Sequence, residues 1–126
     1  TGKDDKAALK LSYSSDQGKS FNSVKDIHGQ ILDANHPDMV VIGKEAWVIF
    51  QGRDPNQSGG WGREKAWLVR VKGDINVSEP SPLPSTGGSV AYPYLVKGNG
   101  GRVYATWTEI GEEGPKVMLC RGRIHS

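Results

Sequence analysis

The chain has 126 residues, 36% of them hydrophobic and 24% charged, which fits one soluble globular domain with a modest core. Its formal net charge of +2 is too small to indicate a nucleic-acid partner, and no apolar run approaches the roughly 20 residues that span a bilayer. The N-terminal segment TGKDDKAALK lacks the apolar core of a signal peptide, but a trimmed mature start would look the same, so the compartment stays open. The single cysteine, Cys120, excludes an internal disulfide and is expected as a small buried thiol.

Strands and turns dominate the predicted elements from the N-terminus onward. Seventeen glycines and seven prolines separate short apolar runs, and no segment shows the 3.6-residue period of an amphipathic helix. The first strand is expected over residues 7–14, where Leu9, Leu11 and Tyr13 alternate with polar residues. Its partner is expected within residues 24–31.

A compact motif, SSDQGKSF at residues 14–21, lies between these two strands. Asp16 is expected to accept N–H bonds within the turn, Gly18 to adopt a positive φ, and Phe21 to fold back as an apolar plug. The motif therefore predicts a tight hairpin in which Ser14, Asp16, Gly18, Ser20 and Phe21 have structural roles.

A repeat occupies the rest of the chain. His36-Pro37 and Tyr92-Pro93 lie 56 residues apart, and each is followed by an apolar strand, a glycine turn, an aromatic-rich strand, a polar loop and a third apolar strand. The expected strands cover residues 39–42, 46–51 and 66–71 in the first unit and residues 94–97, 102–108 and 116–121 in the second. A repeat of this length, made of successive short strands, is typical of a β-propeller blade.

The connections between the units fit the same organisation. Residues 71–77 (VKGDINV) are a weaker echo of the 14–21 motif, and the three prolines of residues 78–88 are typical of an edge strand that runs into a connector. The sequence thus predicts an all-β fold, a β-propeller fragment of about two four-stranded antiparallel blades. Residues 1–33 would form an outer half-blade, residues 34–88 a full blade and residues 89–126 three strands of a last blade.

The segment SSDQGKSF matches the pattern S-x-D-x-G-x-[ST]-[WF], the Asp-box of sialidases and related repeat proteins. With the repeated X-Pro strands, residues 8–121 resemble the last two blades of a six-bladed sialidase-like propeller. The resemblance implies that the Asp-box stabilises the fold at the propeller rim, away from the active face. It also implies an exported protein, extracellular or periplasmic, whose partner is a carbohydrate or glycoprotein and which needs no cofactor, membrane or nucleic acid. Two blades do not close a ring, so the missing blades of a longer chain, or self-association into a ring, would complete the propeller.

Sialidases hold the carboxylate of sialic acid with three arginines and use a tyrosine as nucleophile, and the resemblance carries two of these roles over. Arg63 stands where the third arginine usually lies, and its planar guanidinium suits a carboxylate. Tyr92 begins the last blade, as the nucleophilic tyrosine does, and a neutral nucleophile avoids repulsion from an anionic sugar. However, Pro93 follows Tyr92, and His36 takes the same place in the preceding unit, so a repeat feature that packs the strand entry is the alternative.

Two further residues are candidate ligand contacts. Trp61, in the long loop 54–62, would either stack on a sugar ring or cover the edge of its own blade. Glu109 ends a strand and would either project into a central cleft or lie, with Glu112 and Glu113, at a solvated loop tip. The three histidines lack the spacing of metal ligands, so no metal site is predicted.

The predicted function is therefore the binding or hydrolysis of glycans by part of a sialidase-like propeller. It would be an exo-α-sialidase-like glycoside hydrolase if the missing blades supply the other catalytic groups. The alternative is a non-enzymatic propeller scaffold that binds a protein or a polysaccharide, since this fold hosts many functions. Two further arginines and an acid/base aspartate in upstream sequence would discriminate between the two.

Overall fold

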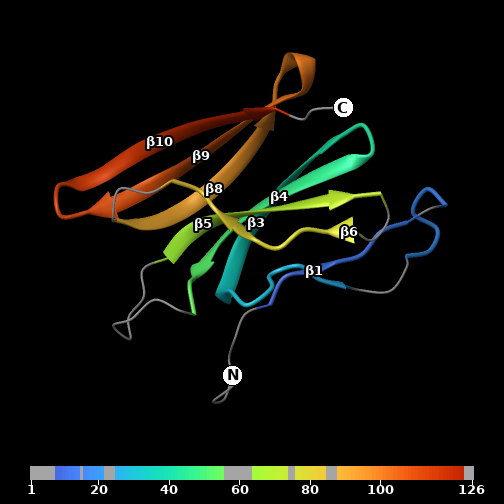
Figure 1. Ribbon diagram of the computed structural model, residues 1–126, viewed down its shortest axis with the longest axis horizontal. Coiled ribbons are helices and arrows are strands. Elements are labelled where there is room, and N and C mark those ends of the chain that lie inside the picture. Colours follow the sequence, from blue (N-terminus) through green and yellow to red (C-terminus); the bar gives the residue numbers. More distant parts are fainter. Residues whose placement is uncertain are drawn as a thin grey trace.

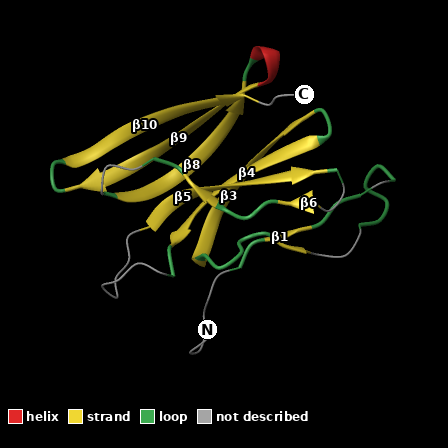
Figure 2. Ribbon diagram, viewed as in Figure 1, coloured by secondary structure: helices red, strands yellow, loops and turns green. Residues whose placement is uncertain are grey.

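The computed structural model describes residues 8–14, 16–21, 25–55, 64–73, 76–84 and 88–123 of the chain. Within these residues every paired strand runs antiparallel to its neighbour, and the one helical element is a 3-10 turn, η1 (Asn99–Gly101). Figure 2 shows this dominance of strands. The predicted all-β antiparallel fold is confirmed. In the part of the chain that is described, no helix has the length and apolar character needed to cross a membrane.

The strands form three sheets, which lie as successive layers in Figure 1. The N-terminal ladder pairs β1 with β2, the middle sheet has the order β3-β4-β5-β6 with β7 also paired to β5, and the last sheet has the order β8-β9-β10. In chain order the strands are β1 (Lys10–Leu11), β2 (Lys25–Asp26), β3 (Leu32–Ile42), β4 (Glu45–Arg53), β5 (Glu64–Lys72), β6 (Asn76–Val77), β7 (Ser81–Pro82), β8 (Ser89–Lys97), β9 (Arg102–Gly111) and β10 (Gly114–Arg123).

The central strand of the middle sheet, β4, is buried on both faces, as its continuous apolar run WVIF predicts. Because successive strand residues point to opposite faces, Val48 and Phe50 pack toward the N-terminal ladder, whereas Trp47 and Ile49 pack toward the last sheet. Two apolar cores result. The first contains Leu9, Ile27, Ile31, Ala34, Val48, Phe50, Trp67, Val69 and Val71, and the second contains Trp47, Ile49, Ala66, Val90, Leu95, Val103, Ala105 and Trp107. Cys120, expected as a buried thiol, is half-buried against the second core.

The first strand of each unit begins earlier than predicted. β3 starts at Leu32 and β8 at Ser89, because a β-bulge carries each strand past its X-Pro pair. The pairing register shifts at residues 35–38 in β3 and at residues 91–94 in β8. A bulge tolerates proline, which has no N–H for the ladder. The interpretation of the X-Pro pairs as strand entries is therefore wrong.

Aligning the two bulges shows that the units stack in the same orientation. The first ladder pair after each bulge involves Ile49 of β4 and Thr106 of β9, so these two residues correspond. Their neighbours Phe50 and Trp107 also correspond, and both pack against the preceding layer. Ile49 packs against the following layer, whereas Thr106 points away from both cores. Propeller blades stack in this sense, although the closed ring stays a prediction.

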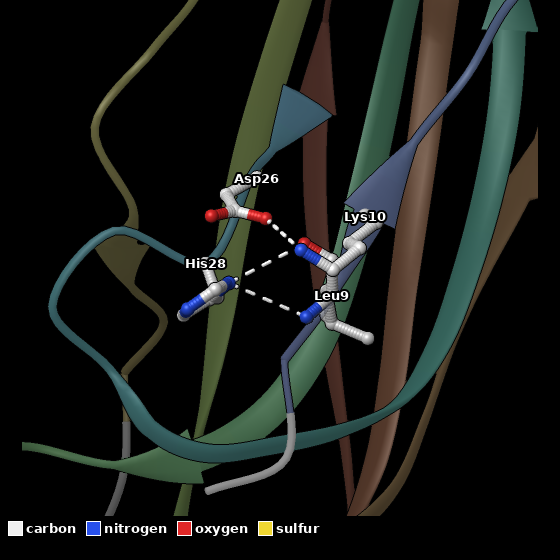
Figure 3. Close-up of polar contacts among 4 residues, drawn as sticks. All are labelled: Leu9, Lys10, Asp26 and His28. Carbon is white, nitrogen blue, oxygen red and sulfur yellow. Dashed lines mark hydrogen bonds and ion pairs between the residues drawn. The ribbon is translucent and has the colours of Figure 1, made fainter. Parts of the chain in front are cut away.

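The N-terminal ladder is short and is held by polar contacts. In the described residues β1 and β2 pair over two positions. This pairing is shorter than the strands predicted at residues 7–14 and 24–31. Lys10 Nζ lies 2.7 Å from Asp26 Oδ1, and this contact lowers the pKa of the Asp26 carboxyl (Figure 3). His28 Nδ1 lies 3.3 Å from both the N and the O of Leu9, so it accepts from the amide or donates to the carbonyl according to its tautomer.

The Asp-box residues form a turn that side chains close onto the backbone. The Ser20 N–H donates to Asp16 Oδ1 over 2.9 Å, and the Gly18 N–H donates to Ser14 Oγ over 2.8 Å. Gly18 has a φ of 90°, and the hydroxyls of Ser20 and Ser14 donate to Asp16 and hold its pKa at about 2. The expectation that Phe21 plugs the hairpin is wrong, because its side chain is 65% exposed. The described pairing of the ladder stops at Leu11 and Lys25, so Phe21 lies beyond the paired strands.

Candidate functional site

The two β-bulges bring polar and aromatic side chains together at one end of the middle sheet. This bulge cluster consists of Asp33, Asn35 and His36 of β3, Gln51 and Arg53 of β4, Glu64 of β5, and Tyr92 of β8. The rings of His36 and Tyr92 meet edge to face, with centroids 5.7 Å apart and planes at 85°. The Asp-box loop lies at the other end of the molecule from the end of β4 and the start of β5 (Figure 1).

Backbone strain is concentrated in the bulge cluster. Four non-glycine residues of the described chain have a positive φ, and three of them belong to the cluster: Asp33 (53°), His36 (53°) and Tyr92 (56°). Each such residue costs on the order of 1–3 kcal/mol, and it persists where surrounding contacts enforce it. Strain of this kind is typical of functional sites, so the contacts that hold these residues indicate how the site is built.

Gln51 holds the bulge of β8 from the neighbouring sheet. Its side chain is buried, with 5% of the residue exposed, and its Oε1 accepts the Tyr92 N–H over 3.0 Å. Its Nε2 donates to Glu64 Oε2 over 2.6 Å, which fixes the orientation of the amide. A second cross-sheet bond runs from the Leu95 N–H to Asp38 Oδ2 over 2.8 Å. Two backbone amides, one on each side of Pro93, thus donate to side chains of the middle sheet.

The remaining members of the cluster surround the bulge of β3. Arg53 forms an ion pair with Asp33, and about a third of each side chain is exposed. Asn35 Nδ2 donates to the Asp33 carbonyl over 2.5 Å and lies 3.4 Å from Glu64 Oε1, and Asn35 Oδ1 contacts His36 Nδ1. The guanidinium of Arg53 carries five donors, so it can bind a further acceptor while it stays paired with Asp33.

This arrangement suits the recognition of a polyhydroxylated ligand. Tyr92 is 57% exposed and His36 is also exposed, so two aromatic rings are open to solvent at the cluster. Beside them, Arg53 and Asp33 supply a partly exposed donor and acceptor. Aromatic rings match the apolar face of a sugar, and paired donors and acceptors match its hydroxyl groups.

A second charged group lies toward the opposite end of β4 and β5 and serves the fold. Arg70 Nε contacts Glu45 Oε1 over 2.5 Å, and the Trp47 indole N–H donates to the same oxygen over 2.9 Å. The hydrogen bond from Arg70 lowers the pKa of Glu45. The Arg70 guanidinium also lies 5.1 Å from the centre of the Trp47 ring, in a cation–π contact. Because Glu45 and Trp47 both bind the Arg70 charge, these three residues stabilise the fold.

The structure places the candidate residues named from sequence in different environments. Tyr92 lies in the bulge cluster with its ring exposed, against the alternative that it packs a strand entry. Glu109 is 2% exposed, and its Oε1 accepts the Gly88 N–H over 3.1 Å, so its placement at a solvated tip is wrong. Arg63 and Trp61 lie outside the described residues.

Five members of the cluster were missed from sequence, namely Asp33, Asn35, Gln51, Arg53 and Glu64. Only one of them carries a local signal, because Gln51 interrupts the apolar run of β4. Asp33, Arg53 and Glu64 lie at or next to strand ends, where polar residues are ordinary, and Asn35 lies beside the bulge of β3. Only the pairing of the strands brings these four residues together.

Comparisons with known proteins identify a similar fold but no family. No family model and no curated protein matches the chain. Its structure is similar to part of a protein from Parabacteroides distasonis ATCC 8503 assigned as a candidate glycoside hydrolase, with a TM-score of 0.54 and 12% sequence identity. The match covers 78% of this chain and 32% of that protein, so this chain spans about a third of its length. At this identity the likeness establishes a shared fold.

Proposed function

We propose that this chain is part of a glycan-binding protein and that the sugar contacts the bulge cluster. The observation that carries the proposal is the exposed ring pair of His36 and Tyr92, each held in a left-handed conformation beside the Arg53–Asp33 pair. The fold shared with a candidate glycoside hydrolase supports the same chemical class of ligand.

A finer form of the proposal is hydrolysis by a secreted, sialidase-like propeller with Tyr92 as nucleophile. The Asp-box turn and the exposed Tyr92 ring support it. It further requires that Arg63 joins Tyr92 at the ligand and that blades outside this chain supply the remaining arginines and the acid/base aspartate.

The second candidate is a non-enzymatic propeller scaffold, and one observation favours it. The charge of Arg53 is already neutralised by Asp33. Glu64 is bonded to Gln51, and Gln51 accepts the backbone N–H of Tyr92, so this chain of hydrogen bonds ends at the Tyr92 backbone and not at its phenol. A nucleophilic tyrosine needs a base at its hydroxyl, so these contacts build a rigid binding surface more readily than a catalytic pair.

Glycan binding is tested by titrating sialylated and neutral oligosaccharides into the full-length protein by calorimetry. Tyr92→Asn removes the ring but keeps the bulge, because asparagine tolerates a left-handed backbone. We expect a fivefold to tenfold loss of affinity, about the value of one stacked aromatic contact. Phe21→Ala, which removes an equally exposed ring from the Asp-box turn, is the control. Unchanged binding by Tyr92→Asn would exclude the cluster, and a fluorogenic sialoside separates hydrolysis from binding.

A further inference from the structure

The outer side of the last sheet is mainly apolar. This open face contains Tyr94 and Val96 of β8, Tyr104 and Ile110 of β9, and Val117 and Leu119 of β10, with Thr106 and Thr108 among them and Arg102 and Arg121 toward one end. The strand register sets them in rows, with Tyr94, Thr106 and Leu119 side by side. Five of them are largely exposed: Tyr94 (55%), Val96 (55%), Ile110 (50%), Val117 (82%) and Leu119 (69%).

The corresponding face of the middle sheet is covered. Trp47 and Ile49, which occupy the places of Tyr104 and Thr106 when the bulges are aligned, are 7% and 0% exposed. They are buried by the inner side of the last sheet, to which Leu95, Ala105 and Trp107 belong. The same face in the same orientation is therefore buried under a sheet in one unit and bare in the next.

We propose that the open face is covered by a further antiparallel β-sheet, contributed by the rest of a longer polypeptide. This sheet would pack on the last sheet as the last sheet packs on the middle one. The side that it presents would carry aliphatic, small and aromatic residues, as Leu95, Ala105 and Trp107 do. The proposal does not depend on the proposed function.

A second copy of the described chain fits the open face less well. Units that stack in one orientation would place on it the outer side of the N-terminal ladder. Lys10 and Asp26, which lie on that outer side, are both exposed and ion-paired, so the contact would bury two charges against a mainly apolar face. The similar protein from Parabacteroides distasonis extends well beyond the matched region, which covers 32% of its chain. Both observations favour a sheet from the same polypeptide.

Thiol labelling of the full-length product of the gene tests this inference. In a Cys120→Ser background, Leu119→Cys places a thiol on the open face, and Lys19→Cys places a control thiol on the exposed Asp-box turn. Each rate of maleimide labelling is measured in native buffer and in denaturant. We expect native protection of at least roughly tenfold for the thiol at position 119, as for groups that react only after local opening, and none at position 19.

Three outcomes would overturn the inference. Equal labelling at positions 119 and 19 would show that the face is open in the whole protein. Protection that disappears on dilution, together with a dimer-to-monomer change in sedimentation, would assign the covering layer to a second copy. Protection in a full-length product that contains no further strands would assign it to a different partner. Val117→Cys repeats the measurement at a second position, should the first variant fold poorly.

Discussion

Replacing the buried amide of Gln51 should loosen the bulge that carries Tyr92. Gln51→Leu keeps the size of the side chain and its apolar stem but removes both hydrogen bonds of the amide. A neutral hydrogen bond contributes a net of about 0.5–1.5 kcal/mol to stability and a bond to a charged group about 1.5–3 kcal/mol, for a total of about 2–4.5 kcal/mol. Glu64 is only half-buried and regains water, so we expect a loss of about 2 kcal/mol, at the low end.

Urea denaturation and thermal unfolding measure this loss directly. At roughly 4 °C per kcal/mol for a domain of this size, the midpoint should fall by about 8 °C. Gln30→Leu, which changes an exposed glutamine in the turn before β3, is the matched control and should change stability by less than about 0.5 kcal/mol. An equally small effect of Gln51→Leu would refute the reasoning, because the left-handed Tyr92 would then be held by something else. The Tyr92 amide resonance in an NMR spectrum should shift in the same variant.

Three further predictions concern the two cores and the Asp-box. In denaturant titrations, Trp67→Phe should lower the free energy of unfolding by about 1 kcal/mol more than Trp107→Phe does. The reason is that Trp67 Nε1 donates to the Gly52 carbonyl over 2.9 Å, whereas Trp107 Nε1 is buried without a partner in the described residues. Equal losses of stability in the two variants would contradict this prediction. Gly52→Ala should destabilise by about 1–3 kcal/mol, since its Cβ would lie 2.4 Å from Ile31 Cγ2 and overpack the first core; an unchanged melting temperature would mean that Ile31 moves away freely. Asp16 has a folded pKa of about 2 against an ordinary 3.8, so its contribution to stability is present above about pH 4 and is lost as the pH falls toward 2. The melting temperature of the wild type should therefore drop more steeply than that of Asp16→Asn over this interval, and parallel curves would remove Asp16 from the stability of the turn.

The core strands were predictable from sequence because their signal is local. The run from Trp47 to Phe50 is apolar on both faces, and a strand buried on both faces has this composition wherever it occurs. The Asp-box turn is local in the same way, since its bonds join residues at most four positions apart.

The bulge cluster was not predictable, because its geometry comes from contacts distant in sequence. Proline at position 93 suggests a strand start, but the Tyr92 N–H finds its acceptor 41 residues away in Gln51, and this bond supports the bulge. The prediction that Phe21 is buried was wrong for a related reason. The motif indicates that the side chain folds back, but it does not indicate whether an apolar surface lies beneath it.

The two backbone amides of β8 that donate to Gln51 and Asp38 affect how the units depend on each other. A self-contained repeat satisfies its own backbone and can be duplicated or exchanged as a module. Here the last sheet completes the hydrogen bonding of residues 92 and 95 only after it docks, through partners 41 and 57 positions earlier in the chain. The two units should therefore unfold as one cooperative block, and hydrogen exchange at these two amides reports docking rather than strand formation. Separating the units would hand both amides to water, so the protein acceptors of this pair exist only while the two units are docked.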